Sequence, residues 1–409
     1  MTQVRLAFGP VLILLGILFG APEVVLVGLL ALLAVGITEL WTRFGLRRLH
    51  YERTLQRDRT VWGEDVPLDM AVWNDKLLPV PWVAVDDGVS SGLVVRDEPL
   101  TTNAVSGAVT FRSRWTVGWY ERVTRHLMLA ADHRGQYVLG PARVTVADLF
   151  GHGGAIADQD DRASYIVRPR TLPVRLTNQR QTPTGELRSR NSLFEDPALF
   201  AGVRPYRPGD PMRRVHWRAT ARTGTPVSKR FDPTRIETIM VALDVQVMSG
   251  SIWVNDEELV ESLMVAASSL VRYSLLEGAS CGLAAMALSR AANGFALIAP
   301  RTGRDQLSTI ADLLARLNVA PSAPFEHLLV RLPQSVAIGT TVLVITARDP
   351  EPYVVALKRL DRLGYPVQVI GLGPNGHHAV SRARAYGFSA MTGSLTPDWR
   401  TSDALVLAS

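Results

Sequence analysis

The chain has 409 residues, more than one hydrophobic core accommodates, so a single-domain protein is excluded. Hydrophobic residues make up 47% of the chain and charged residues 20%, which excludes disordered and fibrous proteins. The single cysteine excludes both an intramolecular disulfide and a thiolate metal cluster. The net charge is +6, but residues 204–235 alone carry +7, so the protein is a nearly neutral body with one basic element.

Two apolar segments begin the chain. Residues 6–22 and 24–38 contain no charged side chain, and a short turn that carries Glu23 joins them. Each must recruit flanking residues to cross a bilayer, which needs about 20 residues. Arginines follow the second segment, so the positive-inside rule predicts a transmembrane hairpin with a basic juxtamembrane segment over residues 1–50 and both ends in the cytoplasm. A cleaved signal peptide is the alternative for the first segment, and it leaves the remainder equally cytoplasmic.

Residues 51–170 show the pattern of short strands. Apolar and other residues alternate from Val66 to Val72, and Gly-, Pro- or Asp-containing turns recur about every ten residues after that. This spacing predicts an antiparallel β-sandwich domain. Residues 171–235 are rich in Arg, Pro, Thr and Gly without periodicity, so we interpret them as a connector.

From residue 236 to residue 409 the pattern changes to alternating strands and helices. Strands are predicted at 239–245, 283–288, 341–345 and 367–370. Helices are predicted after the caps Asn255 and Asp349 and around Leu314. Such alternation predicts an α/β domain with a mainly parallel sheet that helices cover on both faces.

The most informative motif lies inside the basic element. From Gly202 to Arg222 the chain follows the pattern Gly-x-Arg-x-Tyr-x-x-Gly-Asp-x-x-Arg-x-x-His-Trp-x-x-x-Ala-Arg. This pattern resembles the signature of the bacterial family called domain of unknown function 58, and residues 133–141 and 148–151 also look similar to that family. The resemblance implies a membrane hairpin, a β-rich region and a C-terminal domain similar to von Willebrand factor A. The signature residues here are Arg204, Tyr206, Arg207, Gly209, Asp210, Arg213, His216, Trp217 and Arg222.

Two interpretations of this signature stay open. Asp210 can accept hydrogen bonds from arginine forks and Trp217 offers a face for a guanidinium, so the motif can act as an interdomain clamp. The same arginines can instead hold an anion, such as a phosphate, an acidic loop of a partner or lipid headgroups. No nucleic-acid-binding motif surrounds them, so we expect no nucleic-acid partner.

The other candidate sites carry little chemistry. Domains similar to von Willebrand factor A usually hold Mg²⁺ with Asp-x-Ser-x-Ser after their first strand, but here the run is Asp244-Val245-Gln246-Val247-Met248. We therefore predict no metal, no cofactor and no catalytic residues. Cys281 lies in an apolar run and is predicted to be a buried, inert thiol. His377 and His378 are interpreted as a solvated pair in a loop.

These observations predict a scaffold or adaptor without catalytic activity, anchored by two spans in the bacterial inner membrane, whose soluble domains face the cytoplasm. The family implies protein partners such as a MoxR-type AAA ATPase and companion membrane proteins. A partner-binding edge is expected at the carboxyl ends of the parallel strands, near Asp244, Gln246 and Asp349. The alternative is an enzyme that binds an anion or phosphate ligand at residues 204–235.

Overall fold

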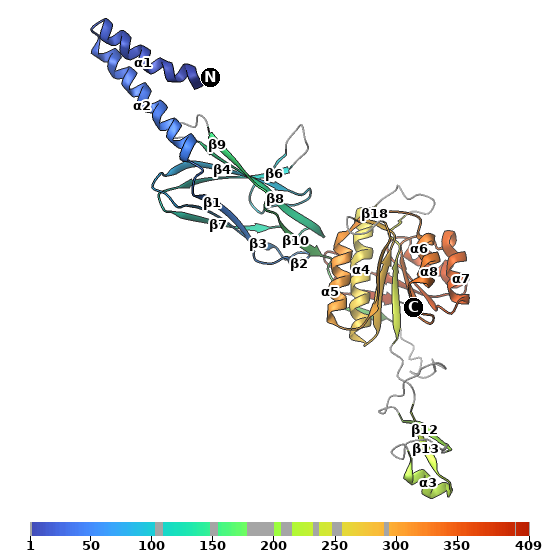
Figure 1. The fold of residues 1–409 in the computed structure, drawn as a ribbon. Coiled ribbons are helices and arrows are strands. Elements are labelled where there is room, and N and C mark those ends of the chain that lie inside the picture. The colour runs from blue at the N-terminus through green and yellow to red at the C-terminus, as the bar shows by residue number, and fades with distance from the viewer. Residues whose placement is uncertain are drawn as a thin grey trace. The chain divides into compact units, whose positions relative to one another are not determined.

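The structure is a computed structural model, and it divides into two compact units, Met1–Pro169 and Arg170–Ser409 (Figure 1). Separate hydrophobic cores lie in the two units. The prediction of a multidomain α/β protein with apolar helical segments at its N-terminus is confirmed. The structure describes residues 2–102, 109–147, 154–177, 200–205, 215–231, 237–247, 256–289, 294–396 and 398–408.

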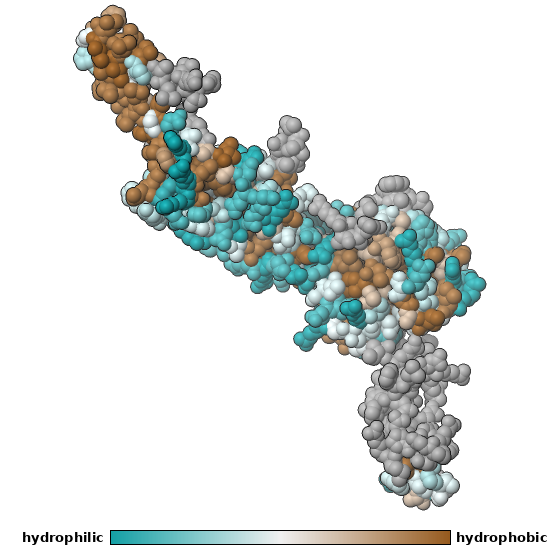
Figure 2. Space-filling model, in the orientation of Figure 1, coloured by the Kyte–Doolittle hydropathy of each residue, from teal (hydrophilic) through white to brown (hydrophobic). Residues whose placement is uncertain are grey.

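The first unit begins with a helical hairpin of α1 (Thr2–Leu18) and α2 (Pro22–Phe44). The helices pack side by side, and Gly16 and Gly28 permit this because a Cβ at either position would meet the opposite helix. Most large apolar side chains of the hairpin are exposed, and Figure 2 shows them as a continuous hydrophobic surface. By length and composition α2 can cross a membrane, whereas α4 (Glu257–Leu276) passes the same test but is largely buried as a core helix.

Two sheets complete the first unit. The smaller has the antiparallel order β1-β3-β7, and the larger has the order β2-β10-β8-β4-β6-β5 with β9 also paired to β8. All their pairings are antiparallel except that of β2 with β10. The strands are β1 (Leu49–Leu55), β2 (Arg59–Val61), β3 (Val66–Asn74), β4 (Val80–Val89), β5 (Thr101–Thr102), β6 (Val109–Val117), β7 (Arg122–Leu129), β8 (Gly135–Ala147), β9 (Gly154–Gln159) and β10 (Ala163–Arg168).

The alternation seen in the sequence explains the core of this unit. Val66, Leu68, Met70 and Val72 on β3 are all buried, and they pack with side chains from both sheets in one cluster. Side chains two residues apart in a strand point to the same face, so these four positions form the inner face of β3. The predicted strand pattern from Val66 to Val72 is therefore confirmed.

A buried ion pair joins the two sheets. Arg53 on β1 donates to the carboxylate of Asp87 on β4 and to the carbonyl of Asp161, and the Tyr51 hydroxyl donates to the same carboxylate. Burial raises the pKa of Asp87, and the neighbouring guanidinium and hydroxyl oppose that shift. Gly140 has φ +101° beside this pair, and a Cβ there would overlap the Asp161 carbonyl and the Arg53 guanidinium. Only glycine fits this position.

The second unit is built on a mixed, mainly parallel sheet of order β11-β22-β21-β20-β19-β14-β15-β17. Only the pairings β21–β22 and β15–β17 are antiparallel. The strands are β11 (Val174–Thr177), β14 (Thr238–Leu243), β15 (Ser280–Ala285), β17 (Ala296–Arg301), β19 (Thr341–Thr346), β20 (Val367–Gly371), β21 (Ser389–Ser394) and β22 (Leu405–Ala408).

Helices cover both faces of this sheet, as the alternating pattern predicts. Val241 on β14 packs with α4 and α5, whereas its neighbour Met240 packs with α6, α7 and α8. Figure 1 shows the two groups of helices on opposite sides of the strands. Their bounds are Arg304–Arg316 for α5, Phe325–Arg331 for α6, Val354–Arg362 for α7 and Gly376–Ala385 for α8, with 3₁₀ helices η2 (Leu332–Gln334) and η3 (Glu351–Tyr353) before α7.

The structure differs from the sequence expectations at several local points. Residues 174–177, assigned to the connector, form the edge strand β11, because they pair in parallel with β22. The helix expected after Asn255 is capped by Asp256, whose carboxylate accepts from the backbone amide of Leu259 at 3.1 Å.

The remaining elements of the second unit lie outside its main sheet. They are β12 (Phe200–Pro205), α3 (Trp217–Thr223) and β13 (Val227–Phe231), and the pair β16 (Ala287–Ser289) and β18 (Leu317–Pro321).

Replacing Gly140 tests the buried pair between the sheets. We expect Gly140→Ala to lower the free energy of unfolding of the first unit by about 3 kcal/mol, because it adds backbone strain and a steric overlap. Hydrogen exchange of β4 and β8 in the full-length protein measures this local stability. Gly63→Ala is the matched control, since Gly63 also has a positive φ (+84°) but has no atom within 4 Å of the added Cβ. Equal effects of the two substitutions would contradict the prediction.

Candidate functional site

The carboxyl ends of β14, β19 and β20 meet at one edge of the sheet, because these neighbouring strands run parallel. Asp244 follows β14, and Arg348 and Asp349 follow β19. Ligands of open α/β sheets bind outside the carboxyl ends of the strands, so this edge is the first candidate site. It is also the edge at which the sequence predicts a partner surface.

Asp244 lies buried at this edge in an ion pair. Its Oδ2 accepts hydrogen bonds from Arg348 Nε at 2.9 Å and from the Thr346 hydroxyl at 3.0 Å. Its Oδ1 accepts a hydrogen bond from the backbone N–H of Gln246 at 3.1 Å. The side chains of Asp244 and Arg348 are 0% and 2% exposed. Burial raises the pKa of the Asp244 carboxyl, while the guanidinium and the hydrogen bonds favour its charged form. The charge is therefore neutralised within the fold.

Tyr353, the last residue of η3, packs against the buried ion pair. The Arg348 guanidinium lies 4.9 Å from the centroid of the Tyr353 ring, a cation–π contact. The Tyr353 hydroxyl donates to Thr346 Oγ1 at 3.1 Å, and burial raises the pKa of this tyrosine. Phe325 packs edge-on against the same ring at 5.1 Å. Asp244, Thr346, Arg348 and Tyr353 thus form one packed polar cluster, which we call the strand-end cluster.

The residues of the strand-end cluster do not fit the divalent cation suggested by the resemblance to von Willebrand factor A. Both carboxylate oxygens of Asp244 already accept hydrogen bonds, and one of these bonds comes from a guanidinium whose charge repels a cation. Hard cations take six or more oxygen ligands. Within the described ranges, no three His, Cys, Asp or Glu side chains are grouped so that they could hold a metal.

A second group of polar side chains lies at the surface of the same edge. Asp349 Oδ2 lies 3.2 Å from His378 Nε2 and 3.5 Å from Arg382 Nε. Arg382 also pairs with Glu351 at 2.7 Å, and all four side chains are accessible to solvent. His377 and His378 stand in the first turn of α8 and not in a loop, because the helix begins at Gly376. We call Asp349, Glu351, His378 and Arg382 the edge surface cluster.

The three residues predicted to form the partner-binding edge differ in their exposure to solvent. Asp244 and Gln246 are buried, so their side chains are not available to a protein that docks at this edge. Asp349 is accessible and belongs to the edge surface cluster. The sequence did not point to Arg348, Thr346 or Tyr353 as site residues, and the one available signal was an arginine that closely follows an apolar strand.

Cys281 is buried as predicted, and this burial raises the pKa of its thiol to about 12.

Only part of the arginine signature lies within the described residues. His216 is the N-cap of α3, and its Nδ1 accepts from the amide of Ala219 at 3.0 Å. Trp217 is exposed at the start of α3, and Arg222 lies in its last turn. Arg204 lies on β12, which pairs with β13. Tyr206, Arg207, Gly209, Asp210 and Arg213 lie outside the described residues.

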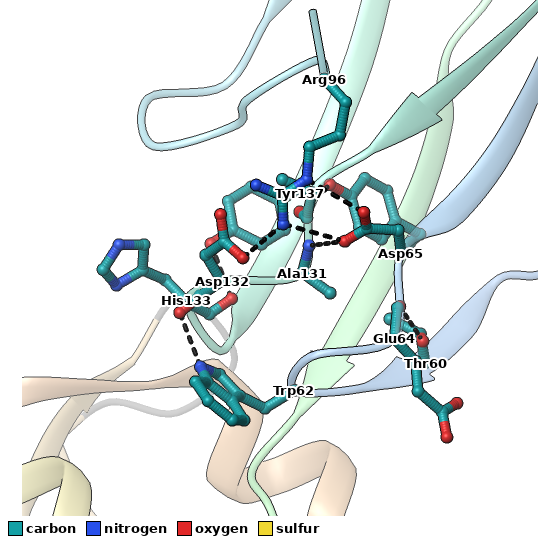
Figure 3. Close-up of polar contacts among 11 residues, drawn as sticks. Thr60, Trp62, Glu64, Asp65, Arg96, Ala131, Asp132, His133 and Tyr137 are labelled. Carbon is teal, nitrogen blue, oxygen red and sulfur yellow. Dashed lines mark hydrogen bonds and ion pairs between the residues drawn. The ribbon is translucent and has the colours of Figure 1, made fainter. Parts of the chain in front are cut away.

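Three segments of the first unit are tied together by Arg96 (Figure 3). Its guanidinium donates hydrogen bonds to both carboxylate oxygens of Asp65, at 2.9 and 3.2 Å, and to the carboxylate of Asp132 at 2.5 Å. Asp65 also accepts from the amide of Ala131 at 3.2 Å, and the Trp62 indole donates to the Asp132 carbonyl at 2.6 Å. These bonds fix the segments before β3, after β4 and after β7. Figure 3 shows the Arg96 fork directed between the two carboxylates, so the arrangement is a structural clamp.

Breaking the strand-end cluster tests its structural role. Arg348→Met leaves Asp244 buried without its counter-ion, so we expect a loss of about 3–5 kcal/mol in the unfolding free energy of the second unit. The double variant with Asp244→Asn should recover part of that loss. Hydrogen exchange of β14 and β19 measures both effects. Arg382→Met is the control, because its ion pairs are exposed and contribute about 1 kcal/mol or less. A loss for Arg348→Met as small as that of the control would contradict the prediction.

The clamp at Arg96 predicts a pH dependence. The hydrogen bonds from Arg96 lower the pKa of Asp65 below its ordinary value of 3.8. A carboxyl with a lowered folded-state pKa stabilises the fold above its ordinary pKa, and this contribution disappears as the pH falls through the lowered value. The difference in unfolding temperature between the wild-type protein and Arg96→Met should therefore be constant above about pH 5 and shrink in stronger acid. A difference that grows in acid would overturn this assignment.

Part of the chain matches a known family. Residues 202–342 match the family described as "Protein of unknown function DUF58". The matched region contains the arginine signature, Asp244 and the start of β19. The resemblance inferred from the signature is therefore confirmed over these residues.

Relatives cover the chain only partly. Uncharacterized protein YeaD of Bacillus subtilis is 23% identical over 277 residues, which are 65% of this chain and 60% of that protein. This chain thus spans less than two thirds of the length of that relative. Among solved structures, the CARDB domain of PF1109 from Pyrococcus furiosus is 15% identical and covers 29% of this chain and 84% of that chain, with a TM-score of 0.19. A cohesin module from Clostridium perfringens is 12% identical and covers 29% and 96%, with a TM-score of 0.20. Scores this low carry no argument about fold or function.

Proposed function

We propose that this protein is a membrane-anchored scaffold without catalytic activity, which presents a β-sandwich and a von Willebrand factor A-like domain to the bacterial cytoplasm and binds other proteins there. The observation that carries the proposal is the hairpin of α1 and α2, whose apolar side chains are exposed and which runs directly into a folded unit. A surface of this kind in a soluble protein is an aggregation hazard, whereas a bilayer accommodates it.

The dimensions and charges of the hairpin support anchoring. With 23 residues, α2 is about 35 Å long, so it reaches across a hydrocarbon core of about 30 Å when the residues that flank its uncharged run of 24–38 are included. Arg43 lies in its last turn, and Arg47 and Arg48 follow it. The connection between the helices, residues 19–21, carries no charge, and Glu23 lies in the first turn of α2, so the positive-inside rule favours a cytoplasmic location for everything after α2.

The carboxyl edge of the second unit supports a binding role over a catalytic one. The Asp244 carboxylate is buried and paired with Arg348, so it is not available as an acid, a base or a metal ligand. The edge surface cluster instead offers charges of both signs to solvent, around Asp349 and Arg382. Charge-complementary protein partners recognise such surfaces. The partner that the family implies, a MoxR-type AAA ATPase, is the one to test first.

Co-purification from membranes tests this proposal. Full-length bait extracted in mild detergent should retain an AAA ATPase, and Arg382→Glu should reduce its recovery several-fold by reversing a charge of the edge surface cluster. Arg359→Glu is the matched control, because Arg359 is an exposed arginine on α7 outside that cluster. Equal recovery with both variants would contradict binding at this edge. Turnover of a phosphate compound by the purified protein alone would instead favour an enzyme centred on residues 204–235.

A further inference from the structure

A loop of the first unit is fixed to the end of α2. The Trp41 indole donates from Nε1 to the carbonyl of Pro79 at 2.9 Å. In the same loop, Lys76 donates from Nζ to the carbonyl of Gly45 at 2.9 Å, and burial lowers the pKa of this lysine to about 8. Two hydrogen bonds, one in each direction, therefore join residues 75–79 to the end of α2.

A second loop lies on the first. The amide of Tyr120 donates to the carbonyl of Lys76 at 3.3 Å. The side chain of Asn74 donates to the carbonyl of Gly118 at 2.6 Å. The loop 118–121 is thus held at the same end of the unit, next to α2. We call residues 75–79 and 118–121 together the α2-side loops.

The tips of the α2-side loops carry large apolar side chains that nothing in the described residues covers. Leu77, Trp119 and Tyr120 are 73%, 68% and 65% exposed. Trp82 on β4 and Ile156 on β9 are also exposed, and α2 packs against β8 and β9 of the same sheet. Figure 2 shows hydrophobic surface continuing from the hairpin onto the adjoining part of this unit. A folded domain rarely exposes several such side chains together without a binding role.

The length of the apolar run in α2 brings these loops to the membrane surface. Residues 24–38 are uncharged and extend for about 22 Å, which is shorter than a hydrocarbon core of about 30 Å. A short span draws its flanking residues toward the bilayer or thins the bilayer locally. The turn of α2 that holds Trp41 therefore lies at the hydrocarbon boundary. Residues 75–79 are bonded to Trp41 and Gly45, and residues 118–121 are bonded in turn to Asn74 and Lys76, so both α2-side loops lie at the depth of the headgroups.

We propose that the α2-side loops insert Leu77, Trp119 and Tyr120 into the interfacial region of the leaflet at which α2 ends, so that the first unit rests on phospholipid. Tryptophan and tyrosine favour this layer, because one end of each side chain is apolar and the other is polar. Arg47 and Arg48 follow α2 at the same level and attract anionic headgroups. This inference rests on the membrane anchoring in the proposed function and adds a second, peripheral contact to it.

Spin labels in the full-length protein test this contact. The protein is reconstituted in vesicles of phosphatidylcholine and phosphatidylglycerol, with Cys281→Ala to remove the buried native thiol. Labels are attached after Trp119→Cys or Leu77→Cys, both at exposed loop tips. Val94→Cys is the aqueous control, because Val94 is exposed at the opposite end of β7, where its carbonyl accepts from Ala130. Leu29→Cys reports on the hairpin itself.

Collision with oxygen, which concentrates in lipid, and with a water-soluble nickel complex separates the outcomes. We expect the oxygen-to-nickel ratio at positions 119 and 77 to exceed that at position 94 several-fold. A ratio at both positions equal to that at 94, with a lipid-like ratio at 29, would overturn this inference and leave the anchoring intact. An aqueous ratio at 29 would overturn both. Protection of 119 and 77 from both reagents would also overturn the inference, because it means that protein, not lipid, covers the loops.

Discussion

The structure depends on removing the apolar surface of α1 and α2 from water. Between Phe8 and Leu40, thirteen large hydrophobic side chains are exposed. Fully burying one such side chain is worth about 1.5–3 kcal/mol, and these side chains are a little over half exposed, so their transfer from water is worth on the order of 10–20 kcal/mol. That is as large as the net stability of a typical domain, about 5–15 kcal/mol. In the proposed function a bilayer takes up this surface, and the hydrogen bonds from Trp41 and Lys76 join the end of α2 to the first folded unit.

Among the described residues, a buried arginine–aspartate pair in each unit joins elements distant in the sequence. Arg53 and Asp87 bridge the two sheets of the first unit, and Asp244 and Arg348 bridge the ends of β14 and β19 in the second. Desolvation offsets much of the attraction within such pairs, so they add little net stability. Losing one partner is costly, and the pairs thus favour one arrangement of strands over its alternatives. The second pair also occupies the position at which a strand-end carboxylate would otherwise be available to a ligand.

Local patterns in the sequence predicted many of the elements but none of these pairs. Alternation on β3 and the strand–helix alternation after residue 236 depend on neighbours, so they can be read from the chain. The pairing of Asp244 with Arg348 depends on the order of strands, which places residues far apart in sequence side by side. The strand β11 was missed because four residues in a segment rich in Arg and Pro give no periodic signal, and its pairing with β22 comes from tertiary contacts. The helix α8 was missed because glycine and proline precede it and made the segment around His377 and His378 look like a loop.

The central claim is that lipid, and no other covering, removes the hairpin from water. Extraction of membranes from cells that express the full-length protein tests this most directly. Alkaline carbonate releases proteins held only by charge or by other proteins, whereas detergent releases those that span the bilayer. We predict that the protein stays in the carbonate-washed pellet and dissolves in detergent. Its recovery in the carbonate supernatant as a dispersed, folded protein would contradict the claim.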